Sequence, residues 1–278
     1  MKNLTFLKSD ADFKDKIKVF VNNHYINETK AIINNYKLSI ANNQSFPLSN
    51  HFNNVWTKLK STYFEIQNGR CCICEKELND IYSQDIEHYR PKNHYWWLAY
   101  NPQNYYLSCA ECNRSYKKIK FPLFDEFPLQ VSQDKTSYIN RKNINNEKPL
   151  LLNPVEDNPD DYFELVFIIH SSTNNGIAIL QSKNGISVTL KERADKTIEI
   201  YNLDLHSYST DSDKSRFNLM NKYYNDLFEI AKARVTMNKK NDFIQFLTKK
   251  LNERQELKTL DLLKLIIRNQ VIINTLTN

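Results

Sequence analysis

Residues with the chemistry to bind a metal ion gather between Cys71 and Phe121, in a stretch that contains all five cysteines of the chain. Four of these cysteines form two C-x-x-C pairs, which is the spacing of paired zinc knuckles. The pairs are Cys71 with Cys74, and Cys109 with Cys112. Four thiolates suit the closed tetrahedron of a structural Zn²⁺, and such an ion stabilises a segment whose own apolar core is thin. The sequence therefore predicts a four-cysteine zinc site.

Cys72 leaves one ligand position open. Its C-x-C spacing to Cys74 also permits pairing, although the C-x-x-C spacing favours Cys71.

No run approaches the roughly 18 apolar residues of a membrane helix, and the N-terminus lacks the apolar core of a signal peptide. We therefore expect a cytoplasmic protein without a membrane partner. Thiols stay reduced in the cytoplasm, so metal binding is favoured over disulfide formation.

Acid–base groups lie between the two cysteine pairs. Residues 85–92 read DIEHYRPK, in which an apolar residue alternates with charged neighbours, as in a short strand that ends at a proline. Glu87 and His88 could divide the work of phosphodiester hydrolysis. The imidazole would take a proton from water near neutral pH, and the carboxylate would hold a divalent cation against the phosphate. Asn113 directly follows the fourth cysteine of the pairs, so a zinc ion would fix its position.

These motifs together resemble the HNH nucleases. The pattern is C-x-x-C, then E-H-x-x-P, then N-x(4)-C-x-x-C-N-x(3)-K, and it is similar to the ββα-metal motif that a four-cysteine zinc site often stabilises. The resemblance implies a first strand at DIEHYRP, a second strand at YYLSC and a helix that starts near Ala110.

The resemblance also implies roles for individual residues. His88 becomes the general base, and Glu87 and Asn113 become ligands of a catalytic Mg²⁺ or Mn²⁺ ion. Asn104 becomes the middle, structural Asn that ties the loop and orients the base. The final motif residue is Asn where many members carry His, which leaves the preferred ion open.

A closer resemblance is to the HNH subunit of Septu-type anti-phage defence systems, which also occurs beside some retrons. It rests on IEHYRPK, YWWLAY, CAECN with a following FPL, LLNP-x-x-D-x-P and KTIEIYNLD, and it covers roughly residues 69–220. The resemblance implies a DNA-degrading antiviral effector that works with an ATPase subunit encoded nearby.

Two other functions stay open on the sequence. One is a stand-alone HNH restriction-type endonuclease, which would need no ATPase. The other is a zinc-stapled module that binds nucleic acid or protein without catalysis, because a fold does not guarantee an activity. A pure binding module has no need of Glu87, His88 and Asn113 together, so this triplet favours an enzyme.

Basic residues close to the acid–base groups are candidates for phosphate contacts. They follow His88 or Asn113 in the chain: Arg90, Lys92, Arg114, Lys117, Lys118 and Lys120. The net charge of +6 adds little support, because it is small for 278 residues. Trp96 and Trp97 are expected to pack in the core over the hairpin rather than to stack on bases.

The elements that must position this site are mainly helical. Apolar residues recur at helical spacing over residues 10–42 and 50–67, and Asn68-Gly69 favours a helix end. The predicted fold class is α+β: a zinc-stapled ββα-metal HNH core embedded in a mainly α-helical protein with a small β-hairpin. The expected parts are an N-terminal helical segment at 1–68, the nuclease core at 69–125 and a C-terminal hairpin and helical region at 126–278.

The C-terminal part is expected to begin with a polar loop over residues 130–148. A turn at Thr173–Gly176 then joins two strands, and Asn184-Gly185 marks a further turn. Helices are predicted near residues 190–202, 213–237, 239–252 and 256–275. The last of these is apolar over most of its surface, so it is expected in the core or against a partner.

Overall fold

The computed structural model describes residues 1–44, 46, 52–78, 80–81, 84–124, 144, 147–169 and 176–203, together with six single positions at residues 229, 233, 237, 242, 245 and 249. Within this part, helices combine with two separate two-stranded antiparallel sheets, so the expected mixture of α and β structure is confirmed. Of the loop expected at 130–148, only residues 144, 147 and 148 are described, and of the helices expected after residue 212, only the six single positions.

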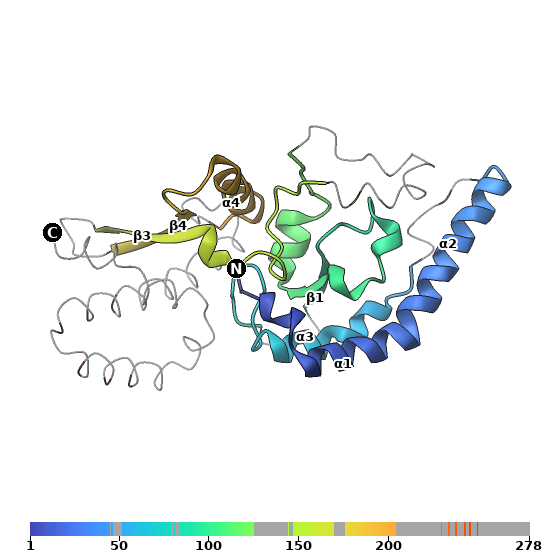
Figure 1. Ribbon diagram of the computed structural model, residues 1–278, viewed down its shortest axis with the longest axis horizontal. Helices are drawn as coiled ribbons and strands as arrows, with labels where there is room; N and C mark the ends of the chain where they lie inside the picture. The colour runs from blue at the N-terminus through green and yellow to red at the C-terminus, as the bar shows by residue number, and fades with distance from the viewer. Residues whose placement is uncertain are drawn as a thin grey trace.

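A long helical segment forms one side of the protein, where α1 and α2 follow each other in Figure 1. It consists of α1 (Ala11–Phe20), a π-helical turn (Val21–Tyr25) and α2 (Ile26–Ala41), with helical backbone angles at both junctions. Asp10 caps α1, because its side chain accepts a hydrogen bond from the backbone N–H of Phe13 at 2.7 Å. The predicted N-terminal helices are therefore confirmed. In the described part of the chain, no helix has the length and apolar character needed to cross a bilayer.

A shorter helical segment leads into the cysteine-rich stretch. It starts as a 3₁₀ turn, η4 (Val55–Leu59), and continues as α3 (Lys60–Ile66). The chain then leaves the helix through Asn68 and Gly69, which have positive φ angles of 54° and 63°. A Cβ atom on Gly69 would lie 3.2 Å from the ring of Phe64, so the position favours glycine for space as well as for conformation. The helix end predicted here is confirmed.

The first sheet is the hairpin of β1 (Asp85–His88) and β2 (Tyr105–Ser108), which pair antiparallel with His88 opposite Tyr105. A π-helical segment, η7 (Glu111–Lys117), follows β2 almost directly. Both strands and the helical segment lie where the sequence resemblance implied them.

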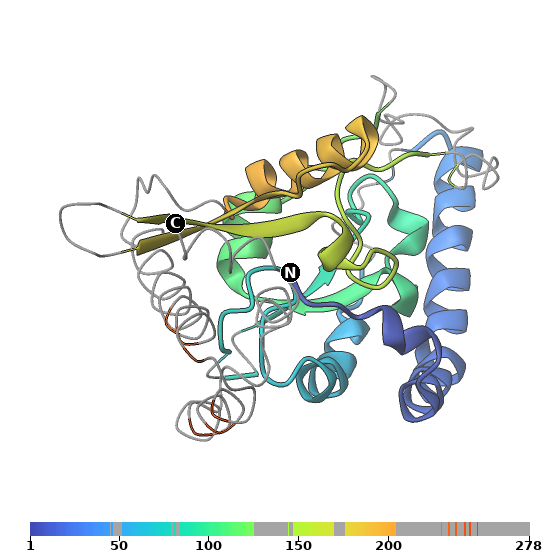
Figure 2. The same ribbon diagram turned by 60° about the vertical axis from the view of Figure 1, so that its left-hand side comes forward.

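The second sheet pairs β3 (Phe163–Ile169) with β4 (Gly176–Ser182), and α4 (Val188–Tyr201) follows. Figures 1 and 2 show α4 lying along this hairpin, on the opposite side of the molecule from α2. The expected second hairpin and the helix near residues 190–202 are confirmed, while the turn between the strands lies outside the described residues.

Arg193 ties α4 to the segment that precedes β3. Its guanidinium forms a two-point ion pair with Asp157, with N–O distances of 2.9 and 2.7 Å. It also donates to the carbonyl oxygens of Pro149 at 3.0 Å and Leu151 at 3.3 Å. A planar guanidinium suits such convergent acceptors, so one side chain links the helix to a loop far away in sequence.

An aromatic core joins the long helical segment to the β1–β2 hairpin. Trp96 and Trp97 are only 4% and 3% exposed, and their ring centroids are 5.7 Å apart. Tyr36 of α2 packs on Trp96 with a centroid distance of 4.7 Å. The two tryptophans are therefore core residues, as predicted.

Candidate functional site

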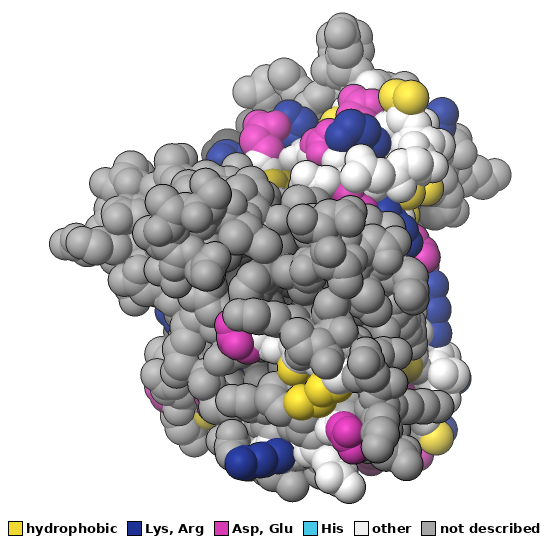
Figure 3. All heavy atoms as spheres, turned by 90° about the vertical axis from the view of Figure 1, so that its left-hand side faces the viewer, with side chains coloured by type: hydrophobic (Ala, Val, Ile, Leu, Met, Phe, Trp, Pro, Cys, Tyr) yellow, Lys and Arg dark blue, Asp and Glu magenta, His cyan; other side chains and the backbone are white. Residues whose placement is uncertain are grey.

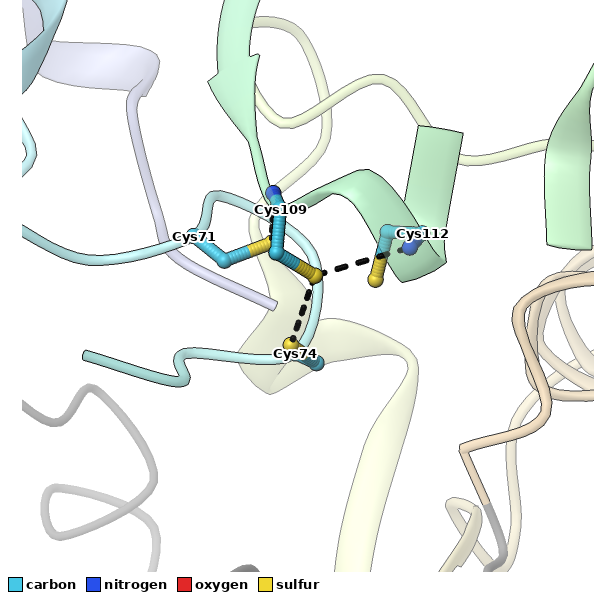
Figure 4. Close-up of side chains that lie close together, drawn as sticks. All are labelled: Cys71, Cys74, Cys109 and Cys112. Atoms are coloured by element: carbon cyan, nitrogen blue, oxygen red, sulfur yellow. Dashed lines mark hydrogen bonds between the residues drawn. The ribbon is translucent and has the colours of Figure 1, made fainter. Parts of the chain in front are cut away.

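Four cysteine sulfurs converge where the chain after α3 meets the end of β2, as Figure 4 shows. The Sγ atoms of Cys71, Cys74, Cys109 and Cys112 all lie within 4.8 Å of one another, and all four residues are buried. The Sγ atoms of Cys74 and Cys109 are 3.8 Å apart. A tetrahedron with Zn–S bonds of about 2.3 Å has edges of about 3.8 Å, so the cluster could hold a zinc ion.

The surroundings of the sulfurs also suit a dication. Backbone N–H groups donate to Sγ of Cys71 at 3.3 Å and to Sγ of Cys109 at 3.5 Å. Hydrogen bonding to the other sulfurs raises the pKa of the Cys109 thiol, and burial raises the pKa of the Cys112 thiol. A cation at the centre would supply the charge that lets these buried thiols ionise. Cys72 is buried outside the cluster, so the ligand position left open by the sequence goes to Cys71.

Gln67 fixes the first cysteine pair to the hairpin. Its fully buried amide donates from Nε2 to the carbonyl oxygens of Arg70 and Leu107, each at 2.8 Å, and accepts from the Leu107 N–H at 2.9 Å. The N–H of Cys72 also donates to Leu107 O at 3.0 Å. One side chain thus satisfies backbone groups at the junction of α3, the first cysteine pair and β2. The sequence gave no local signal for this role.

Glu87 and His88 share the end of β1 but face opposite sides of the hairpin, because successive strand residues alternate. The His88 ring packs edge-on against Trp56 of η4 and Tyr105 of β2, with centroid distances of 5.0 and 4.9 Å. The Glu87 carboxylate instead pairs with Lys117 of η7. The structure therefore places the predicted base and the predicted carboxylate on two different faces.

His88 is held as a neutral imidazole. Its Nε2 lies 2.9 Å from the carbonyl oxygen of Ala99. A carbonyl can only accept, so Nε2 carries the proton and Nδ1 keeps its lone pair. Burial is the main cause that lowers the pKa of His88 to about 3; the Lys92 ammonium acts in the same direction and the bond to Ala99 in the opposite one. His88 is thus uncharged at physiological pH, with Nδ1 able to accept a proton.

Lys92 follows β1 and lies near the ring of Trp56. Its Nζ is 5.5 Å from the ring centroid of Trp56, the ring that also contacts His88. Burial lowers the pKa of Lys92, while Glu87 acts in the opposite direction. Among the described residues, none forms an ion pair with Lys92, so this half-buried cation lacks the partner that a structural lysine normally has.

Glu87 and Lys117 form a buried ion pair, with side-chain exposures of 2% and 0%. Lys117 Nζ contacts Glu87 Oε1 and donates to the carbonyl oxygen of His88 at 2.8 Å. Burial raises the pKa of Glu87, and the Lys117 ammonium opposes that effect. Lys117 was expected at the surface as a phosphate contact, but its ammonium is instead engaged in the interior.

The Asp85 carboxylate accepts hydrogen bonds from two polar residues of η7, Asn113 and Arg114. It accepts from Asn113 Nδ2 at 3.1 Å, from Arg114 Nε at 2.7 Å and from a terminal Arg114 nitrogen at 2.6 Å. Because Nδ2 of Asn113 points at a carboxylate, its Oδ1 is turned elsewhere. Sequence reasoning did not single out Asp85. The signal was its two-residue spacing from Glu87, which puts both carboxylates on one face of a strand.

Asn104 holds the chain that follows β1. Its Oδ1 accepts from the N–H of Arg90 at 2.8 Å, and its Nδ2 donates to the Arg90 carbonyl at 3.0 Å. This arrangement ties Arg90, two residues after His88, to the residue that precedes β2. The Arg90 side chain pairs with the largely buried Glu147, so it too is engaged within the protein.

A hard divalent cation would find oxygen donors beside η7. Glu87 Oε2 is buried and has no hydrogen-bond partner within the described part of the chain. A buried carboxylate oxygen without a hydrogen-bond partner is available to a cation, and carboxylate and amide oxygens are ligands that Mg²⁺ accepts. Glu87 and Asn113 therefore fit such an ion in donor chemistry, although Lys117 already neutralises part of the charge of Glu87.

Charges on the described surface are mixed. Where described residues reach the face seen in Figure 3, acidic and basic side chains lie beside one another. Oppositely charged side chains also pair along α4, where Lys191 lies 3.3 Å from Asp195 and Lys196 lies 2.5 Å from Glu199. That face therefore offers no uninterrupted basic patch among the residues that are described.

Fold and site define a protein that combines helices with two small antiparallel sheets and has a buried four-cysteine cluster that could hold zinc. The chain is 30% identical over 158 residues to the Septu protein PtuB of Bacillus mycoides strain KBAB4. This match covers 52% of the chain and 46% of that relative, so the chain corresponds to less than half of the relative's length. The similarity supports a relationship to the Septu proteins. No model of a protein family matches the chain, and no solved structure matches it.

Proposed function

We propose that the protein is a metal-dependent HNH endonuclease or nickase that acts on DNA as the effector of a Septu-type anti-phage defence system, together with an ATPase partner. The defence role rests on the similarity to PtuB and on the sequence resemblance. The chemistry rests on His88 and Lys92, because a neutral imidazole and a half-buried ammonium group, which forms no ion pair among the described residues, both contact the ring of Trp56.

Lys92 and His88 suit a phosphate. A phosphodiester oxygen would give Lys92 the anionic partner that the described residues do not provide. The same negative charge would stabilise the imidazolium and so raise the pKa of His88 from its low value, which makes Nδ1 a stronger base when substrate is bound. Base strength would thus be coupled to substrate binding.

The proposed hydrolysis begins with His88 Nδ1 taking a proton from a water molecule that attacks the phosphorus. Lys92 balances the negative charge that grows on the phosphate oxygens. Asn104 keeps the loop after His88 in place, so the base stays oriented. Glu87 and Asn113 would hold the divalent ion on the other face of the hairpin from His88. Its Lewis-acid stabilisation of the phosphorane and of the leaving 3′ oxygen would require the phosphate to lie at the end of β1, where Glu87 and His88 adjoin.

One observation favours a different candidate, a zinc-stapled module that binds without cleaving. Glu87 is neutralised by Lys117, and His88 has a pKa of about 3 in the unliganded protein. An enzyme must overcome both conditions, whereas a binding module need not. The two candidates differ in whether bound DNA is cut.

The test is nicking of supercoiled plasmid by the zinc-loaded protein, purified with the co-encoded ATPase and assayed with and without added Mg²⁺ or Mn²⁺. We expect cleavage that depends on the added ion and is lost in His88→Ala, while zinc content stays unchanged and the variant stays folded at the assay temperature. Truncation of the buried ring should lower the unfolding temperature, which circular dichroism measures. His24→Ala is the matched control, because His24 lies in the π turn after α1. DNA binding without nicking in all ions would favour the binding module, and nicking without the ATPase would favour the restriction-type enzyme.

A further inference from the structure

The face of the β1–β2 hairpin that η7 covers carries more oxygen donors than the proposed reaction uses. Asp85 and Glu87 lie on this face, opposite Ser108 and Tyr106 in the pairing register. Glu87 Oε2 and Ser108 Oγ are both buried, and neither has a hydrogen-bond partner among the described residues. Two unsatisfied buried oxygens beside a second carboxylate indicate that a ligand of positive charge belongs there.

Asp85 is the second carboxylate, and Arg114 occupies both of its oxygens, so a cation can bind Asp85 only when Arg114 moves away. The Arg114 guanidinium donates hydrogen bonds to both Asp85 oxygens, at 2.6 and 2.7 Å, and Asn113 donates to one of them at 3.1 Å. The Arg114 side chain is 68% exposed, whereas the Asp85 side chain is 17% exposed. The guanidinium can therefore swing into solvent without disturbing the core, and the carboxylate that it would release stays in place.

We propose that Asp85 is a further oxygen ligand of the divalent ion at this face, and that Arg114 occupies Asp85 until its guanidinium moves to a phosphate of the nucleic acid. The inference rests on the proposed function and adds a ligand and a gate to it. Glu87 Oε2, Ser108 Oγ and Asp85 would then contribute oxygen donors of the kind that Mg²⁺ and Mn²⁺ prefer.

Competition is the physical basis of the gate. An arginine binds carboxylate and phosphate with the same two-point geometry, so a phosphate can replace Asp85 as its partner. Removal of Arg114 from Asp85 lowers the local positive charge and frees a ligand, and both effects favour a cation. By linkage, nucleic acid and cation then strengthen each other's binding, which would restrict the loaded site to the substrate-bound protein.

The experiment measures Mn²⁺ affinity by electron paramagnetic resonance on the zinc-loaded full chain, without nucleic acid. Asp85→Asn should weaken Mn²⁺ binding at least about tenfold, the range typical for residues that support a metal site. Arg114→Gln should tighten it several-fold. In the double variant Arg114→Gln should no longer increase the Mn²⁺ affinity, because it acts by freeing the Asp85 carboxylate.

The matched controls are Asp195→Asn and Lys191→Gln, which change the same charges in the exposed α4 pair. Both should leave Mn²⁺ affinity unchanged. The proposal is overturned if Asp85→Asn binds Mn²⁺ like Asp195→Asn, or if the gain from Arg114→Gln persists in the double variant. Zinc content and unfolding temperature show whether an Asp85 variant has lost its fold. If it has, the test uses the two basic residues instead, and equal Mn²⁺ affinities of Arg114→Gln and Lys191→Gln overturn the proposal.

Failure of this inference is separable from failure of the proposed function. If Glu87→Gln loses Mn²⁺ binding and nicking while Asp85→Asn keeps both, the nuclease stands and the added ligand does not. If wild-type protein binds Mn²⁺ through Asp85 but never nicks DNA, the cation site stands and the nuclease does not.

Discussion

Replacement of Lys117 by Met should destabilise the protein strongly at alkaline pH and much less at acidic pH. Lys117 and Glu87 pair inside the protein, with side-chain exposures of 0% and 2%. Met fills similar space but removes the ammonium, so Glu87 must either remain charged without a partner or take up a proton. Loss of one member of a buried ion pair typically costs about 3–5 kcal/mol.

The protonation route gives the pH dependence. A glutamate with an unfolded pKa of about 4.3 requires about 1.36 kcal/mol per pH unit to be held neutral above that value. The cost of Lys117→Met is therefore about 5 kcal/mol at pH 8 and about 2 kcal/mol at pH 6. The sign follows from a Glu87 pKa that is raised in the folded variant, because such a group loses stability as pH rises. In the wild-type protein Lys117 opposes that rise.

Urea unfolding of the zinc-loaded protein, followed by circular dichroism at pH 6 and pH 8, measures the difference from wild type. Lys196→Met is the control, because the Lys196–Glu199 pair has side-chain exposures of 33% and 66%. An exposed pair contributes less than about 1 kcal/mol, and its loss should depend little on pH in this range. A Lys117→Met cost below about 1 kcal/mol at pH 8, or the same cost at both pH values, would refute the buried-pair reasoning.

Three further outcomes follow from the contacts. Cys109→Ser should lose bound zinc and unfold at lower temperature, because Cys109 belongs to the cluster. Cys72→Ser should keep one zinc per chain by mass spectrometry, because Cys72 does not belong to it. Gln67→Leu should cost more than about 2 kcal/mol in urea unfolding, because it strands buried backbone groups of Arg70 and Leu107. Asn104→Ala should reduce the rate of any nicking more than it weakens DNA binding, and equal loss of both would contradict its positioning role.

Local spacing was sufficient for much of the framework. Strand alternation and a following proline located β1, helical periodicity located α1, α2 and α4, and the Asn-Gly pair located the end of α3. The C-x-x-C spacing selected the four sulfurs that converge, including the choice of Cys71 over Cys72. These features depend on neighbours within a few residues, so a single sequence contains the information for them.

Pairing between distant segments could not be read in the same way. Arg90 meets Glu147, and Arg193 meets Asp157, across loops whose path no local pattern specifies. Gln67 became important only because α3, the first cysteine pair and β2 meet at its amide. Each of these contacts depends on which elements pack together over the hairpin.

The sequence by itself therefore determined the zinc-competent cysteines, the strand that carries Glu87 and His88, and the helices around them. Only the tertiary structure decided that His88 is buried as a neutral base against Trp56 and that Lys117 is buried against Glu87. The physical reason is that charge state and burial depend on the element that covers each face. Local periodicity assigns a side chain to a face, but η4 and η7 determine what that face contacts.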